Sequence, residues 1–192
     1  MSYITDSFDE KVIELLKSGS IGFMPSDTIY GLSCLALNNN AVERIHKLKD
    51  RSSGKPFIVL ISDTAQLKRL GVISTEIAAA LRYWPGPLTI ISGAEKAPSW
   101  LHLGTKTLAV RQPDNQKLLE LMKKTGPLIS TSANIAGQKP IDSVAEAQKV
   151  FGEKLDFYID AGVIKGKPST IIKKNSYKFE VIRQGAVKFK EI

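Results

Sequence analysis

Two hydroxyl-rich segments of this sequence each follow a short apolar run, the position at which strands of α/β proteins end. Residues 25–31 hold three side-chain hydroxyls and one carboxylate, on Ser26, Asp27, Thr28 and Tyr30. Such groups can hydrogen-bond a small polar ligand, and the tyrosine ring can form a wall beside it. A proline-serine-aspartate turn next to a buried tyrosine explains the same residues, and composition alone favours this structural interpretation.

The second hydroxyl-rich segment, residues 130–137, follows the apolar pair at 128–129 and includes Ser132 and Asn134. Its side-chain donors, together with backbone N–H groups, could bind an anion or the edge of an adenine. A turn stabilised by its own serine and asparagine side chains is the structural alternative. Because binding residues concentrate in loops at strand ends, both interpretations stay open at this point.

Four cationic side chains could reach a ligand bound by these segments. Lys49 and Arg51 lie near the end of an expected helix, and an ammonium beside a planar guanidinium is a good clamp for phosphate or carboxylate. Arg111 and Arg183 each end an apolar run, so both could reach one crevice. The structural alternatives are cations that complement a helix dipole in the first pair and ordinary surface charges in the second.

Apolar periodicity predicts the strands and helices that position these residues. We expect a capping box of Ser7 and Glu10 to open the first helix, and a second box of Ser143 and Glu146 to open a helix that ends at Gly152. The other expected helices lie near 42–48, 64–70, 75–83 and 115–124, and the expected strands are 21–24, 32–37, 57–61, 88–91, 108–110, 128–129, 157–159, 170–172 and 179–182. This alternation predicts an α/β fold with a twisted mixed sheet flanked by helices.

The composition fits one globular domain that spans residues 1–192. No stretch approaches the ~18 apolar residues of a membrane helix, and the N-terminus lacks the pattern of a signal peptide. Cys34 is the only cysteine, so no intramolecular disulfide can form, and these absences favour the cytoplasm.

The net charge is +8, and residues 165–192 carry eight Lys/Arg against two Glu. That basic end could meet ATP or RNA, although a solvated lysine-rich surface is the preferred interpretation.

Several familiar signatures are absent from the sequence. No G-x-G-x-x-G occurs, and the run 162–168 departs from a P-loop in spacing and in the proline that replaces Ser/Thr. His46 and His102 are isolated from other metal-ligating residues, so we expect no zinc site. Cys34 lies in a strand-like run and is expected to be a small core residue rather than a nucleophile.

Six short segments together resemble the YrdC/TsaC family, the threonylcarbamoyl-AMP synthases. They occur in the order of that family, and the similarity extends from the first helix to Gly185. The segments are 25–31, Lys49-x-Arg51, 84–89, 109–111, 130–134 and 183–185. Each segment alone is a weak signal, but six in order are specific.

The resemblance implies a YrdC-like fold with a deep, basic concave surface. It also implies a nucleotidyltransferase, an L-threonylcarbamoyladenylate synthase that converts L-threonine, bicarbonate and ATP to threonylcarbamoyl-AMP and pyrophosphate, with Mg²⁺ expected beside the ATP. Downstream transferases would pass the threonylcarbamoyl group to tRNA, for which we expect weak binding by the basic end of the chain.

By the same resemblance, Lys49 and Arg51 are the catalytic residues, and they surround threonine and bicarbonate together with Thr28 and Tyr30. The residues implied for ATP binding are Arg51, Arg111, Ser132, Asn134 and Arg183. Two positions depart from the family pattern, because Asp27 stands where Glu is usual and Ser52 where Pro is common.

Two other functions fit part of the sequence. An RNA-binding module for double-stranded RNA or ribosomal precursors would suit the basic balance, but motifs of RRM and KH domains are missing and aromatic residues make up only 7%. The third possibility is an adenylate-binding carbamoyltransfer domain that works only within a larger assembly. Threonine-dependent turnover by the isolated chain distinguishes the enzyme from both.

Overall fold

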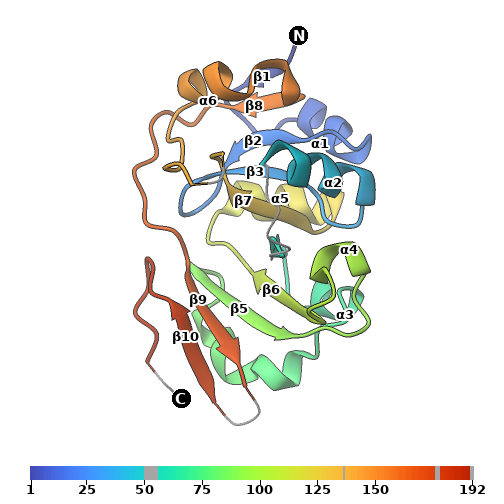
Figure 1. Ribbon diagram of the computed structural model, residues 1–192, viewed down its shortest axis with the longest axis vertical. Coiled ribbons are helices and arrows are strands. Elements are labelled where there is room, and N and C mark those ends of the chain that lie inside the picture. Colours follow the sequence, from blue (N-terminus) through green and yellow to red (C-terminus); the bar gives the residue numbers. More distant parts are fainter. Residues whose placement is uncertain (50–55, 136, 176–177, 191–192) are drawn as a thin grey trace.

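The strands of the chain form one mixed sheet in the order β1-β8-β2-β3-β7-β4-β6-β5-β9-β10 (Figure 1). The computed structural model describes residues 1–49, 56–135, 137–175 and 178–190. The strands are β1 Tyr3–Thr5, β2 Gly22–Pro25, β3 Tyr30–Leu35, β4 Ile58–Leu60, β5 Leu88–Gly93, β6 Thr107–Arg111, β7 Leu128–Ser132, β8 Phe157–Ile159, β9 Thr170–Lys174 and β10 Phe179–Arg183. Every strand predicted from the sequence is present, and the mixed α/β sheet is confirmed.

The short strand β4 connects the two halves of the sheet. It pairs antiparallel with β7, the last strand of the upper half in Figure 1, and parallel with β6, the first strand of the lower half. The other parallel pairs are β1 with β8, β2 with β8, and β5 with β9. Strands distant in the sequence are therefore neighbours, and loops from both halves meet near β4.

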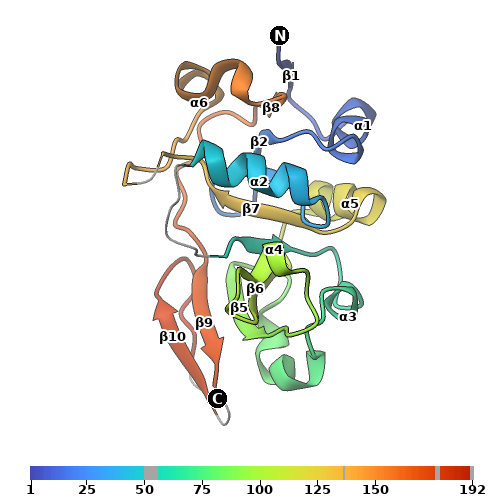
Figure 2. The ribbon, with the colours of Figure 1, turned by 45° about the vertical axis from the view of Figure 1, so that its right-hand side comes forward.

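The helices lie along the sheet (Figure 2). The α-helices are α1 Glu10–Lys17, α2 Asn39–Leu48, α3 Gln66–Arg69, α4 Ser99–His102, α5 Gln116–Thr125 and α6 Val144–Phe151, and the 3₁₀ helices are η1 Ser74–Tyr83 and η2 Gly152–Lys154. Each predicted helix is present, although the one predicted at 75–83 has 3₁₀ geometry. No helix in the described ranges is long and apolar enough to cross a membrane.

Two clusters of buried side chains form the core. In the smaller cluster α1 and α5 pack together over the sheet through residues that include Leu16, Leu118 and Met122. The larger cluster includes Val42 and Ile45 of α2. Cys34 is buried in this larger cluster, and its burial raises the pKa of the thiol, which confirms a core residue rather than a nucleophile.

The cap of the first helix differs from the prediction. Asp9, not Ser7, is the N-cap residue, and its Oδ1 accepts a hydrogen bond from the Val12 N–H at 2.9 Å. Its Oδ2 accepts hydrogen bonds from the hydroxyls of Tyr3 and Thr5, so the cap also ties the helix to β1. Ser7 and Asp9 both have side chains that can cap a helix, and they lie two residues apart. The hydrogen bonds from β1 to Asp9 explain why Asp9 is the cap. The predicted second box was also wrong, because Ser143 occupies the N-cap of α6 without a side-chain capping bond.

Replacing Asp9 by Ala should therefore lower the free energy of unfolding by about 1–2 kcal/mol, the usual loss for a helix cap. Ser7→Ala is the matched control, because its hydroxyl meets only the Thr5 hydroxyl, at 3.3 Å, and we expect a change within about 0.5 kcal/mol. Urea unfolding of both variants measures the difference. A larger loss for Ser7→Ala would restore the predicted capping box.

Candidate active site

A cavity of about 560 Å³ lies where loops from the two halves of the sheet meet. The upper half supplies the loop between β2 and β3 and the segment from β7 to Asn134, and the lower half supplies β6, the segment before β9, and the end of β10. Seven of the eight site residues predicted from the sequence line this cavity: Thr28, Tyr30, Lys49, Arg111, Ser132, Asn134 and Arg183. The eighth, Arg51, lies outside the described residues.

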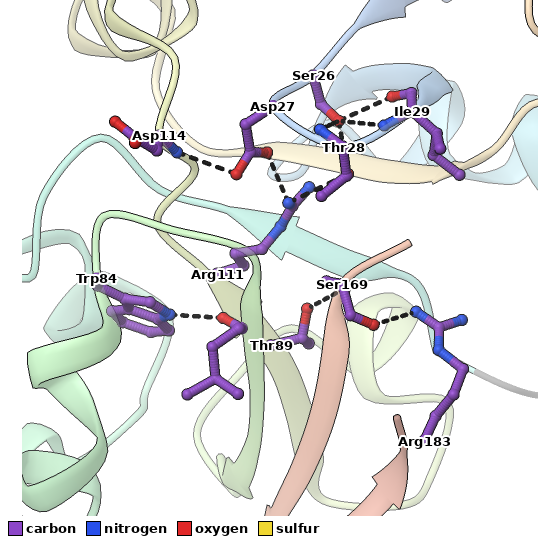
Figure 3. A network of polar contacts seen from close by, with 11 residues as sticks. Ser26, Asp27, Thr28, Ile29, Trp84, Thr89, Arg111, Asp114, Ser169 and Arg183 are labelled. Atoms are coloured by element: carbon purple, nitrogen blue, oxygen red, sulfur yellow. Dashed lines mark hydrogen bonds and ion pairs between the residues drawn. The ribbon is translucent and has the colours of Figure 1, made fainter. Parts of the chain in front are cut away.

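The first feature of the site is a buried ion pair between its two sides (Figure 3). Arg111 Nη1 donates to Asp27 Oδ1 at 2.6 Å, and the two side chains are only 4% and 5% exposed. The other carboxylate oxygen of Asp27 accepts from the Asp114 N–H at 3.1 Å. The same Nη1 lies 3.3 Å from the Thr28 hydroxyl, to which it donates. A carboxylate from the β2–β3 loop thus fixes an arginine at the end of β6.

Arg111 keeps hydrogen-bonding capacity for a ligand. Its Nε–H is buried and meets no acceptor in the described part of the chain. Burial lowers the pKa of its guanidinium, Asp27 opposes that shift, and the charge of Arg183 adds to it. An arginine pKa starts so far above neutrality that the group stays charged. An unmet donor on a buried cation is costly, so the site is suited to an anion.

The second arginine approaches from β10. Arg183 Nη2 donates to the Ser169 carbonyl at 2.8 Å, and partial burial lowers the pKa of its guanidinium. The Ser169 hydroxyl lies 2.8 Å from the hydroxyl of Thr89, which holds the segment before β9 against β5 (Figure 3). No carboxylate pairs with Arg183 within the described ranges, so its charge faces the cavity without a counter-ion.

The third cluster of the site consists of Lys49, Ser132 and Asn134. In it the lysine donates hydrogen bonds to the loop after β7. Its ammonium donates to the carbonyls of Ser132 and Asn134 and, at 2.9 Å, to Asn134 Oδ1. Ser132 Oγ donates to the same Oδ1 at 2.7 Å. Lys49 is only 4% exposed, and all three of these bonds go to protein acceptors. Lys49, predicted with Arg51 as a ligand clamp, therefore also shapes the loop after β7.

Tyr30 lines the cavity with its ring rather than its hydroxyl. The ring stacks on Phe23 with 4.4 Å between centroids. The hydroxyl donates to the Gly162 carbonyl at 2.8 Å and accepts from the Ala161 N–H at 2.7 Å. Its polar group is thus used within the protein.

The sequence analysis missed several lining residues. Ser169 and the apolar side chains of Phe57, Ile58, Ile91 and Ile171 also face the cavity. Each belongs to or adjoins a strand that was predicted, but nothing in the local sequence says which strand faces the cavity. Only the order of strands in the sheet brings them together.

The described residues contain no group of three or more His, Cys, Asp or Glu side chains that could hold a metal ion. Both oxygens of the Asp27 carboxylate already have partners. The geometry thus favours binding of a molecule with anionic and hydrogen-bonding groups beside apolar side chains.

Comparison with known proteins agrees with this geometry. A family model named Sua5_yciO_yrdC and described as telomere recombination matches residues 14–185. A Methanocaldococcus jannaschii protein is 35% identical over 191 residues, 95% of this chain and 90% of that protein. A Pyrococcus abyssi protein named threonylcarbamoyl-AMP synthase is 34% identical over 92% of this chain, which spans only 54% of that protein's length.

The crystal structure of P. abyssi Sua5 complexed with L-threonine superposes with a TM-score of 0.85 and 30% identity. The alignment covers 96% of this chain and 57% of that one. The family match over most of the sequence and the shared fold lead to one assignment: this chain belongs to the Sua5/YciO/YrdC family.

Proposed function

We propose that this chain, acting as one domain, is an L-threonylcarbamoyladenylate synthase that forms threonylcarbamoyl-AMP and pyrophosphate from L-threonine, bicarbonate and ATP. The observation that carries the proposal is the cavity in which seven predicted site residues meet around a buried arginine with an unmet donor. The name of the P. abyssi relative and the threonine bound to its structure support the proposal. Transferases that deliver the group to tRNA in the cytoplasm would be the downstream partners.

The reaction needs no protein nucleophile. The threonine amine and bicarbonate form a carbamate with loss of water, and a carbamate oxygen then attacks the α-phosphorus of ATP. The new O–P bond forms as the bond between the α-phosphorus and the bridging oxygen breaks, and the electron pair leaves with pyrophosphate. Positioning of the reactants and neutralisation of charge can supply most of the acceleration.

The residues divide between these tasks. Arg111 and Arg183 supply fixed positive charge, which favours carboxylate and phosphate groups. Thr28 and the ring of Tyr30 line the amino-acid side of the cavity. Ser132 would offer its hydroxyl oxygen to the nucleotide, and Asn134, whose Oδ1 and Nδ2 already have protein partners, would shape the loop beside it. Lys49 holds the loop that carries them.

Mg²⁺ would enter as part of the substrate rather than as a resident cofactor. Mg²⁺ at nucleotide sites is held largely by phosphates and water, with one or two carboxylates. The described residues around the cavity offer no carboxylate free of protein partners, since both oxygens of Asp27 accept hydrogen bonds from the protein.

The purified protein should release pyrophosphate and threonylcarbamoyl-AMP only when threonine, bicarbonate and ATP are all present. The carbamate requires both of the first two, so omitting either should reduce the signal to background. A pyrophosphate assay with mass spectrometry of the nucleotide product measures this. ATP cleavage independent of threonine, or no adenylate from folded protein, contradicts the proposal.

Arg183→Ala should lower kcat/KM by roughly 100- to 1,000-fold, the usual loss when one donor to developing charge is removed. Arg44→Ala is the matched control, because Arg44 also carries a guanidinium but pairs with Asp156, outside the cavity lining. We expect Arg44→Ala to stay within a few-fold of wild type. Equal effects of the two substitutions in steady-state kinetics would show that Arg183 has no role in the site.

L-threonine should be preferred over L-serine by roughly 10- to 200-fold in kcat/KM, the range for one methyl-sized group in an apolar pocket. Because the Tyr30 hydroxyl is used within the protein, Tyr30→Phe should keep this ratio, whereas Tyr30→Ala should reduce it by removing the ring. Competition kinetics with both amino acids gives the ratios. A wild-type ratio near one would mean that no methyl pocket exists.

A further inference from the structure

We propose that Asp27 is a positioning residue for the amino-acid substrate, acting through Arg111 and Thr28. This inference rests on the proposed function and adds to it a residue outside the cavity lining. Ser26, Thr28 and Arg111 line the cavity, but Asp27 does not. Its side chain is 5% exposed, and each carboxylate oxygen has a protein partner. Asp27 therefore affects a ligand only through the groups that it holds.

The first group that Asp27 holds is the guanidinium of Arg111. Nη1 carries two protons, and the two acceptors within reach are Asp27 Oδ1 at 2.6 Å and Thr28 Oγ1 at 3.3 Å. Two acceptors on one nitrogen fix the plane of the guanidinium. The Nε–H is buried and has no acceptor among the described residues, and Arg111 lines the cavity, so an anionic group bound there would meet a guanidinium with hydrogen-bonding capacity left.

The second group is the Thr28 hydroxyl, which lies between Arg111 and Ser26. The Ser26 hydroxyl has one proton, which it donates to the Ile29 carbonyl at 2.8 Å. Ser26 Oγ also accepts from the N–H groups of Thr28 and Ile29, at 3.2 and 3.4 Å, and lies 3.0 Å from Thr28 Oγ1. Thr28 Oγ1 has two lone pairs and accepts from Arg111 with one of them, so the other can accept from a ligand in the cavity.

An acceptor at Thr28 beside a cation at Arg111 is the arrangement that a zwitterion requires. A carboxylate accepts from the guanidinium, and an amine donates to the hydroxyl oxygen. An α-amino acid carries both groups on adjacent atoms, whereas a nucleotide phosphate offers only acceptors. Asp27 supports this arrangement because its charge anchors the arginine that donates to the Thr28 hydroxyl.

Asp27→Asn removes the charge and keeps the size, so it should raise the KM for threonine by about 10- to 100-fold, as expected for a misplaced contact. The KM for ATP should change less. Asp27→Glu restores the carboxylate and should recover part of the loss. Asp114→Asn is the matched control, since Asp114 contributes its backbone N–H to the network while its side chain is exposed, and it should behave as wild type.

A purely structural role predicts a different outcome. Loss of folded protein lowers the apparent kcat in proportion and leaves both KM values unchanged. A wild-type KM for threonine in Asp27→Asn, with the loss confined to kcat, therefore overturns the inference. Titration calorimetry with L-threonine alone keeps the test separate from the proposed function, because binding and its loss in Asp27→Asn can be measured even if no adenylate is made.

A double variant keeps the test decisive if Asp27→Asn alone does not fold. Removing both partners of a buried ion pair is less destabilising than leaving one charge unpaired. If Asp27 acts through Arg111, then Arg111→Gln and Asp27→Asn/Arg111→Gln should bind threonine equally. Weaker binding by the double variant would show that Asp27 has a contact of its own and would overturn the inference.

Discussion

A guanidinium that is almost completely buried must have a carboxylate beside it, and the cavity depends on how Arg111 meets this constraint. Desolvation of an unpaired cation would cost several kcal/mol, and Asp27 offsets this cost with a charge at hydrogen-bond distance. The carboxylate comes from the upper half of the sheet and the arginine from the lower half. The pair thus ties both sides of the cavity together and holds the guanidinium of Arg111 in the cavity lining.

The three cations of the cavity are compensated to different extents, which gives each a different capacity for ligands. Lys49 donates to carbonyl and amide oxygens of the loop after β7, so these hydrogen bonds are used within the protein. Arg111 has its charge balanced by Asp27 but keeps an N–H without a partner among the described residues. Arg183 donates to the Ser169 carbonyl and pairs with no carboxylate in the described part of the chain. Its positive charge beside the cavity favours a polyanionic substrate such as ATP.

The sequence predicted the elements of this fold more completely than it predicted how they meet. Nine of the ten strands in the described ranges were anticipated because apolar runs bounded by Gly, Pro and Asn are a local signal, and only β1 was missed. The order of strands is not local, since β8 inserts between β1 and β2 and β4 joins β7 to β6. Lys49 shows the resulting limit, because its charge beside Arg51 predicted a clamp for a ligand. Only the register of β7 reveals that the lysine ends on the loop itself.

The segment before β9 shows the same limit in a different way. Its glycine at 166 lies so close to the β2–β3 loop that an added Cβ would be 1.9 Å from the Thr28 carbonyl, so no larger residue fits. Four residues earlier, the Gly162 carbonyl accepts the Tyr30 hydroxyl. The loop that would hold threonine and the segment that carries Ser169 are therefore joined at two points. Because the Ser169 carbonyl also accepts from Arg183, the same segment contacts the amino-acid loop on one side of the cavity and the second arginine on the other.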